Sequence, residues 1–205
     1  MLDERGRVQE TVRHARTDDL TRSLSAFEPD VVAIDSPPAW GTAGGQRAAE
    51  RALLRLGIHS YGTPSDPARQ ANSFYDWMRE GFRAFQAAEA KGYPLYRGGS
   101  PRHTAMEVFP HASAVALAGA LPPSGLAPSA KATWRAEVLR GRGIDTGPLQ
   151  GPDQIDAALA ALTGLLALDG RRATFGDPAE GLIVVPFETL PDRPLSRDAP
   201  SKEAR

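Results

Sequence analysis

A short apolar run that ends in an acid constrains this chain more than any other feature. Residues Val31 to Ile34 are all apolar and follow the turn-like segment 28–30. A continuous run of this length is typical of an interior strand that is buried on both faces. Asp35 and the sequence SPP end the strand, and ligands of open parallel sheets bind at this carboxyl edge. We therefore predict a buried strand that presents Asp35 to a functional site.

Three further acids lie on two other predicted core elements. Glu107 lies within the apolar run 105–109, which a proline ends. Asp153 and Asp156 open the Ala- and Leu-rich helix predicted over 153–168. Residues three apart share a helix face, and the helix dipole favours ionised carboxylates at its N-terminus. Acids on three core elements predict a carboxylate cluster that binds a metal ion.

Composition places the chain among ordinary globular proteins of the cytoplasm. Its 205 residues suit a single domain, predicted over 1–190, followed by a disordered Pro- and charge-rich tail over 191–205. The absence of cysteine excludes disulfides, zinc–thiolate sites and thiol nucleophiles, and it fits a reducing cytoplasm. No apolar stretch reaches membrane-spanning length, so we predict no membrane association.

Charge is distributed unevenly along the chain. The net charge is −1, but residues 36–142 carry 13 Lys or Arg and 7 Asp or Glu. Lys131 and Arg135 lie four apart on one face of the helix predicted over 131–140, and they are candidate contacts for a nucleic-acid backbone. The alternative is a solvated basic face, which is common on helices.

The order of the expected elements indicates an α/β fold. Apolar strands alternate with helices, which is the pattern of a sheet flanked by helices. A polar strand over 7–14, before the first helix, suggests an antiparallel edge and hence a mixed sheet. Further helices are expected to begin at Thr17 and to cover 46–56, 72–90 and 111–117, with a closing strand over 182–185.

The helix expected over 72–90 carries an aromatic stripe. Phe74, Trp77, Met78, Gly81 and Phe85 recur at helical spacing, which predicts one buried face. We interpret this stripe as core packing rather than as an aromatic ligand site.

Four segments together resemble one known family. They read VVAIDSPPAW, AMEVFPHASAVAL, DQIDAALAALTG and GDPAEGLIVVP, and the resemblance covers the chain from about residue 2 to residue 186. In their order and spacing they are similar to domain-of-unknown-function family 429, a family of predicted nucleases with a ribonuclease-H-like fold.

The resemblance implies a ribonuclease-H-like mixed sheet flanked by helices, with carboxylates at one edge that bind Mg²⁺ or Mn²⁺ for phosphodiester hydrolysis. Asp35 resembles the acid at the end of the fourth strand, and Glu107 resembles the strand-borne glutamate of the family. Asp153 and Asp156 are similar to the acidic pair that opens the last helix of Holliday-junction resolvases. The implied metal ligands are Asp35, Glu107 and Asp156, with Asp153 in support.

The sequence departs from the family pattern at its start. The principal metal ligand of the superfamily is an aspartate in the first strand, and a chain that begins MLD has no such strand. The N-terminal hairpin is therefore expected to be truncated. Either further sequence lies upstream of Met1, or the hairpin has been lost together with the activity.

Each candidate residue also has a structural interpretation. Asp153 is suited to capping its helix, Asp35 to an Asx turn, and Glu107 to an outward position on an edge strand. His111 is placed to contact a phosphate or move a proton, and alternatively to cap a helix or face solvent.

These observations predict a divalent-metal-dependent nuclease that acts on DNA or RNA. The alternative is a non-catalytic nucleic-acid-binding or scaffold protein that retains the fold, which the missing first strand favours. A phosphotransferase on a related sheet is a third class, and the lack of a phosphate-binding loop and of a second lobe disfavours it.

Overall fold

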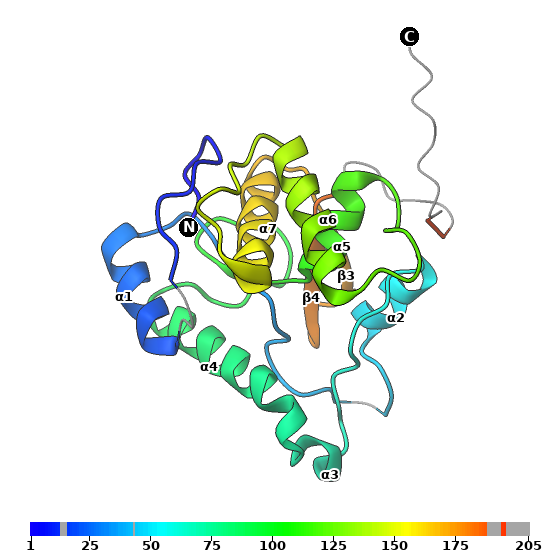
Figure 1. The fold of residues 1–205 in the computed structure, drawn as a ribbon. Helices are drawn as coiled ribbons and strands as arrows, with labels where there is room; N and C mark the ends of the chain where they lie inside the picture. Colours follow the sequence, from blue (N-terminus) through cyan, green and yellow to red (C-terminus); the bar gives the residue numbers. More distant parts are fainter. Residues whose placement is uncertain (13–15, 43, 188–193, 196–205) are drawn as a thin grey trace.

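The computed structural model describes residues 1–12, 16–42, 44–187 and 194–195 (Figure 1). The chain forms a four-stranded sheet in the order β1-β2-β4-β3. Its strands are β1 (Val32–Ile34), β2 (Ala105–Val108), β3 (Ala173–Asp177) and β4 (Gly181–Val185). The described helices are α1 (Thr17–Phe27), α2 (Ala48–Arg55), α3 (Pro67–Gln70), the 3-10 turn η1 (Ser73–Tyr75), α4 (Asp76–Ala90), α5 (Pro110–Ala118), α6 (Pro128–Gly141) and α7 (Gly151–Leu168).

The sheet is mixed, which confirms the predicted α/β class. β1 pairs with β2 and β2 pairs with β4 in parallel, while β3 runs antiparallel to β4. β1 was predicted to be an interior strand buried on both faces, but it forms one edge of the sheet and only Val32 in it is buried. Its carboxyl end leads directly to Asp35.

The antiparallel strand is not the one that the sequence suggested. In the described part of 7–14, residues 7–12 form no strand, and Val8 makes only an isolated bridge with Leu2. The antiparallel strand is β3, which the tight turn before Gly181 joins to β4; the Glu180 amide donates to the Asp177 carbonyl over 3.0 Å. Sequence reasoning missed β3 because a single large apolar residue, Phe175, marks its buried face.

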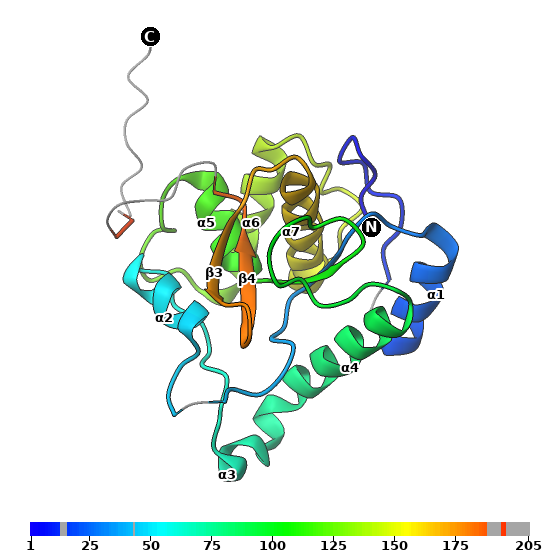
Figure 2. The same cartoon turned by 180° about the vertical axis from the view of Figure 1, so that it is seen from behind.

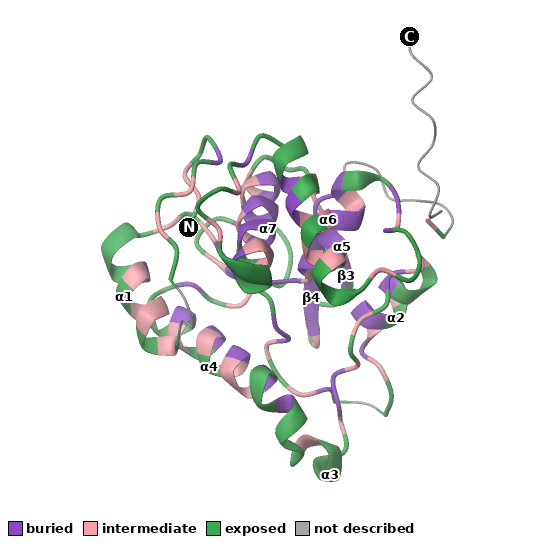
Figure 3. Cartoon of the chain, viewed as in Figure 1, coloured by how far each residue is buried: buried purple, intermediate pink, exposed green. Residues whose placement is uncertain are grey.

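Helices cover both faces of the sheet (Figures 1 and 2). On one face, α7 packs on β2 and β4 through small and branched residues, and α5 and α6 lie beside it. On the other face, α1 and α4 pack against β1, and α2 packs against β3 and β4. The most continuous burial lies along α7 and the inner strands (Figure 3).

The expected aromatic stripe is only partly buried. Met78, Gly81 and Phe85 face the core as predicted, whereas Phe74 is 52% exposed and Trp77 is 41% exposed. The helix expected over 72–90 begins only at Asp76, so Phe74 belongs to η1 and not to the face of α4.

The chain end is described only at two residues. The disordered tail predicted over 191–205 lies outside the described residues, except at Pro194 and Leu195. The Leu195 amide donates to the Leu56 carbonyl over 3.1 Å, and its side chain packs on the core beside α2. None of the described helices has the length and apolar character needed to cross a bilayer.

Candidate acidic site at the sheet edge

Strand alternation determines which way Asp35 points. Val31 and Ala33 pack with the residues of α7, while Val32 and Ile34 pack with α1 and α4. Side chains of a strand alternate between faces, so the next residue on the α7 face is Asp35. Its carboxylate lies in a pocket between the end of β1 and the start of α7.

The first turns of α7 supply the other acids of this pocket. Asp153 and Asp156 are separated by three residues and share a helix face. Asp153 lies inside the first turn, and the N-cap position is held by Gln150, so the capping interpretation of Asp153 is not needed. The pocket has a volume of about 300 Å³ and is lined by Ala33, Asp35, Asp153, Asp156, Ala157 and Ala160. We call it the acidic pocket.

Desolvation and mutual repulsion raise the pKa values of two acids of the acidic pocket. Desolvation by the surrounding protein raises the pKa of Asp35 to about 7, and the negative charge of Asp156 adds to this effect. Burial likewise raises the pKa of Asp156 to about 6, although Arg135 opposes the shift. Asp35 remains open to water, and no hydrogen bond to its carboxylate is seen among the described residues. Both carboxylates therefore lack full electrostatic compensation.

Arg135 of α6 is the cation nearest to these acids. Its Nη2 atom donates to Asp156 Oδ2 over 3.2 Å, and its Nε atom lies 2.6 Å from Asp156 Oδ1. The second contact lacks hydrogen-bond geometry, and within the described chain both atoms are buried without a hydrogen-bond partner. The pair is therefore only partly aligned, but both carboxylate oxygens of Asp156 contact Arg135, so another ligand of Asp156 must compete with this guanidinium.

Glu107 does not join this cluster. In β2, Met106 and Val108 face α7, so Glu107 points to the opposite face of the sheet. Both of its carboxylate oxygens accept hydrogen bonds from Arg47, over 2.9 and 2.5 Å. The prediction that Glu107 lies beside Asp35 and Asp156 as a metal ligand is corrected here, as is the alternative of an outward edge position.

A buried polar network surrounds Glu107. Arg47 precedes α2, and its Nε atom also donates to Glu50 over 3.1 Å and to Thr63 over 3.1 Å. Arg47, Glu50 and Glu107 are each at most 3% exposed. Burial disfavours the charged guanidinium, but the hydrogen bonds and charge of Glu107 outweigh it and raise the pKa of Arg47. Sequence reasoning missed this network because Arg47, Arg51 and Arg55 are spaced like a solvated basic face.

The remaining predicted residues lie on α5 and α6. His111 is half-buried, and its ring centroid lies 5.8 Å from that of Phe109 and 6.1 Å from that of Trp134. Burial lowers the pKa of His111 to about 4, and the charges of Arg135 and Lys131 lower it further. His111 is therefore neutral at pH 7. Lys131 is exposed and open to an anion, whereas Arg135 is engaged by Asp156.

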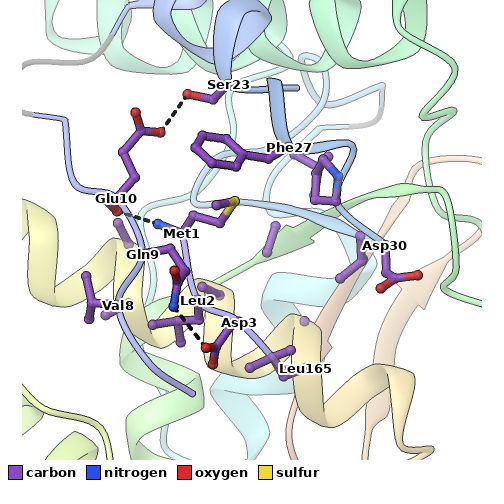
Figure 4. Close-up of a pocket in the computed structure, with 18 of the residues that line it drawn as sticks. Met1, Leu2, Asp3, Val8, Gln9, Glu10, Ser23, Phe27, Asp30 and Leu165 are labelled. Atoms are coloured by element: carbon purple, nitrogen blue, oxygen red, sulfur yellow. Dashed lines mark hydrogen bonds between the residues drawn. The ribbon is translucent and has the colours of Figure 1, made fainter. Parts of the chain in front are cut away.

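A larger pocket, of about 930 Å³, adjoins the acidic pocket, with which it shares Ala33 and Ala157, and lies between the N-terminal segment, α1, β1 and α7 (Figure 4). None of the predicted acids lines it. Its polar groups are occupied: the Met1 amine donates to the Glu10 carbonyl over 2.7 Å, and Asp3 accepts from the amides of Arg5 and Arg7. These backbone hydrogen bonds, led by that of Arg7, lower the pKa of Asp3. Asp3 therefore stabilises a turn.

The donor set of the acidic pocket suits a hydrated divalent cation. Mg²⁺ prefers carboxylate oxygens, keeps several waters and often needs only one or two protein carboxylates. Asp35 has no hydrogen-bond partner among the described residues, whereas both oxygens of Asp156 contact Arg135, with which a bound cation would compete. Within the described residue ranges, no three His, Asp or Glu side chains are grouped closely enough to enclose a metal ion. The pocket therefore fits a hydrated ion held by two carboxylates.

Comparison with known proteins places the chain in one family. No curated protein and no solved structure matches it. The match to a family model runs from residue 3 to residue 181 and includes β1, β2, α7 and every residue of the acidic pocket. The chain belongs to the family described as Protein of unknown function (DUF429).

Proposed function

We propose that this protein is a divalent-metal-dependent nuclease of the ribonuclease-H-like type, and that the acidic pocket is its active site. The carrying observation is that Asp35 and Asp156, from different elements, line one water-accessible pocket without full compensation of their charge. The pocket lies at the carboxyl edge of a parallel strand, where ligands of α/β sheets commonly bind. The absence of cysteine fits an enzyme that works in the cytoplasm.

In this proposal Asp35 and Asp156 hold Mg²⁺ or Mn²⁺, and Asp153 orients the waters of the ion. The bound ion supplies a polarised water and charge stabilisation for phosphodiester hydrolysis. Arg135 and the exposed Lys131 lie on the α6 side of the acids and balance the charge of the incoming phosphate. Glu107 does not touch the ion, and its pair with Arg47 holds β2 in place.

His111 has a limited role in this chemistry. Its pKa of about 4 keeps the imidazole neutral at pH 7, so it cannot act there as a cationic phosphate contact. A neutral imidazole still accepts a proton or a hydrogen bond. We assign His111 to packing between Phe109 and Trp134 and give it no step in hydrolysis.

Cleavage assays on paired variants test this proposal. Labelled single- and double-stranded DNA and RNA are incubated with the protein and Mn²⁺, and cleavage is compared with that in EDTA. Asp35→Asn and Asp156→Asn should abolish metal-dependent cleavage and remain folded. Asp18→Asn is the matched control, because Asp18 lies in the first turn of α1 and is exposed there. Cleavage by the two pocket variants at the wild-type rate would reject the proposal.

A second candidate function is nucleic-acid binding without hydrolysis. Two observations favour it: Glu107 is committed to Arg47, and the described residues enclose no ion with three ligands. The same assays separate the candidates, because a scaffold protein binds nucleic acid equally in Mn²⁺ and EDTA and never shortens it.

A further inference from the structure

The molecule exposes three large aromatic side chains close together in its chain and fold. Tyr61 is 70% exposed, Phe74 is 52% exposed and Trp77 is 41% exposed. Tyr61 lies on the connection between α2 and α3, and the other two lie in η1 and at the start of α4. Large aromatic residues usually bury most of their surface, and exposed apolar groups that gather together mark interaction sites. We call these three residues the aromatic surface.

A continuous series of ring contacts holds two members of the aromatic surface, Tyr61 and Phe74, whereas no ring contact of Trp77 is seen among the described residues. The rings of Tyr61 and Phe74 meet edge to face with centroids 5.5 Å apart, and Phe74 meets Tyr75 at 5.0 Å. Tyr75 then contacts Trp40 at 6.3 Å, and Trp40 contacts Phe82 at 4.8 Å. Tyr75 is only 8% exposed, so the inner rings anchor the outer ones. This support fixes the orientation of Phe74 in the absence of a ligand.

Two arginines contact the same series of rings. The guanidinium of Arg79 lies 5.6 Å from the ring centroid of Trp40, and Arg69 donates to the Tyr75 hydroxyl over 2.9 Å. Arg79 is paired with Asp76, whereas Arg69 forms no ion pair within the described residues. An exposed aromatic ring beside a guanidinium without an ion pair is a combination that binds single-stranded nucleic acid, because bases stack on rings and phosphates pair with arginine, and Arg69 supplies that guanidinium.

The aromatic surface is connected to the acidic pocket by a short stretch of chain. Asp35 and Trp40 are five residues apart, a reach of at most about 18 Å. Ser36 also touches α4, because a Cβ added to Gly81 would lie 1.8 Å from the Ser36 hydroxyl oxygen. Trp77 lies one helical turn before Gly81, about 6 Å along the axis. Asp35 faces α7 whereas Ser36 faces α4, so a nucleic-acid strand that reaches both regions has to pass around the sheet edge at β1.

We propose that the aromatic surface binds single-stranded nucleic acid by stacking on its bases and so selects the substrate of the acidic pocket. The inference rests on the proposed function, because it assigns that site a single-stranded substrate. Stacking needs an unpaired base, so a continuous duplex is not expected to use this surface.

Binding measurements in EDTA test the inference without cleavage. Fluorescence anisotropy is recorded with a labelled oligothymidylate of about 15 nucleotides, which covers the usual range of site sizes. Phe74→Ala should weaken binding about 5- to 150-fold, the loss expected for one stacked base. Phe74→Trp keeps a stacking ring and should bind like the wild type. Phe27→Ala is the matched control, since Phe27 is 45% exposed at the C-terminal end of α1, where it lines the larger pocket.

An abasic oligonucleotide of the same length separates stacking from general loss of affinity. It retains the phosphates, so the wild type should bind it more weakly than oligothymidylate, and Phe74→Ala should bind it no worse than the wild type does. The inference is overturned if Phe74→Ala binds oligothymidylate normally, if Phe27→Ala loses as much, or if the wild type does not bind. It is also overturned if Phe74→Ala changes only the sedimentation behaviour, because the surface would then join two copies of the chain.

The two proposals fail in different ways. If the protein cleaves nucleic acid but shows no stacking-dependent binding, the nuclease assignment stands and the aromatic surface has no part in it. If the protein never cleaves but shows stacking-dependent binding, and Asp35→Asn binds as well as the wild type, the hydrolytic function is rejected and the binding role of the aromatic surface is retained.

Discussion

Replacement of Arg47 by methionine should destabilise the fold more than any change in the acidic pocket. Arg47 is 3% exposed and is the only cation seen to pair with Glu107 among the described residues. Methionine has a similar length but no charge and no donors. The substitution leaves the buried carboxylates of Glu107 and Glu50 without their cation.

The expected magnitude follows from the cost of an unpaired buried charge. Removing one partner of a buried ion pair typically costs about 3–5 kcal/mol, because the desolvated charge that remains has no compensation. For a chain of this size each kcal/mol lowers the melting temperature by about 2–4 °C, so Arg47→Met should lower it by roughly 6–20 °C. Burial also raises the pKa of Glu107, an effect that Arg47 opposes; without Arg47, protonation of Glu107 should recover part of the loss at low pH.

Thermal and urea unfolding at pH 7 measure this effect, with two variants as references. Arg51→Met removes an exposed arginine from the next turn of α2 and should change stability by less than about 0.5 kcal/mol. The double variant Arg47→Met, Glu107→Leu removes both charges of that pair and should recover part of the loss, because Glu50 remains buried without its cation. A cost below about 1 kcal/mol for Arg47→Met alone would show that Glu107 is not desolvated in the way that the structure indicates.

Three further outcomes are expected. Without divalent cations, the stability of the wild type relative to Asp35→Asn should fall as pH rises from about 4 to about 8, because the raised pKa of Asp35, about 7, makes its ionised form destabilising. The lowered pKa of His111 changes stability in the opposite sense, but this effect is the same in both proteins and cancels in the difference. A stability difference that does not change with pH would contradict this prediction. Gly81→Ala should destabilise by about 1–3 kcal/mol, and Ser36→Gly in the same chain should restore stability, because the added Cβ overlaps the serine side chain; urea unfolding decides. Arg135→Gln should tighten Mn²⁺ binding in titration calorimetry, because the acidic pocket then lacks its resident cation, and unchanged or weaker binding would count against a metal at this position.

The strands that carry the acidic pocket could be predicted because they are marked by composition. β1 and β4 are continuous apolar runs, and helix α7 begins within two residues of its expected start. β3 was missed because Gly176 and Asp177 interrupt the alternation of apolar and polar residues that marks a strand. Short, locally encoded signals thus identified the continuous apolar strands, including β1 at one edge, whereas the other edge strand, β3, escaped because its composition is mixed.

The geometry of the site was less accessible from the sequence. Asp35 was placed correctly at the end of its strand, but the face of Glu107 depends on how β2 pairs with β1, and no local pattern encodes that register. The burial of Arg47 was equally hidden, since its partners lie 3, 16 and 60 residues away. Exposure of Phe74 was missed because the break between η1 and α4 interrupts a regular helical spacing.

The pair of Arg47 and Glu107 has a consequence for how the strands align. In the sheet, Glu107 lies opposite Ile34, the residue that precedes Asp35. A slip of β2 by one residue would turn Glu107 toward α7 and force an apolar side chain against the guanidinium. That arrangement would leave the charge of Arg47 unpaired in the interior on one face of the sheet and would add a further acid to the acidic pocket on the other face. The ion pair therefore fixes the register of β2 against β1, and with it the position of the Asp35 carboxylate.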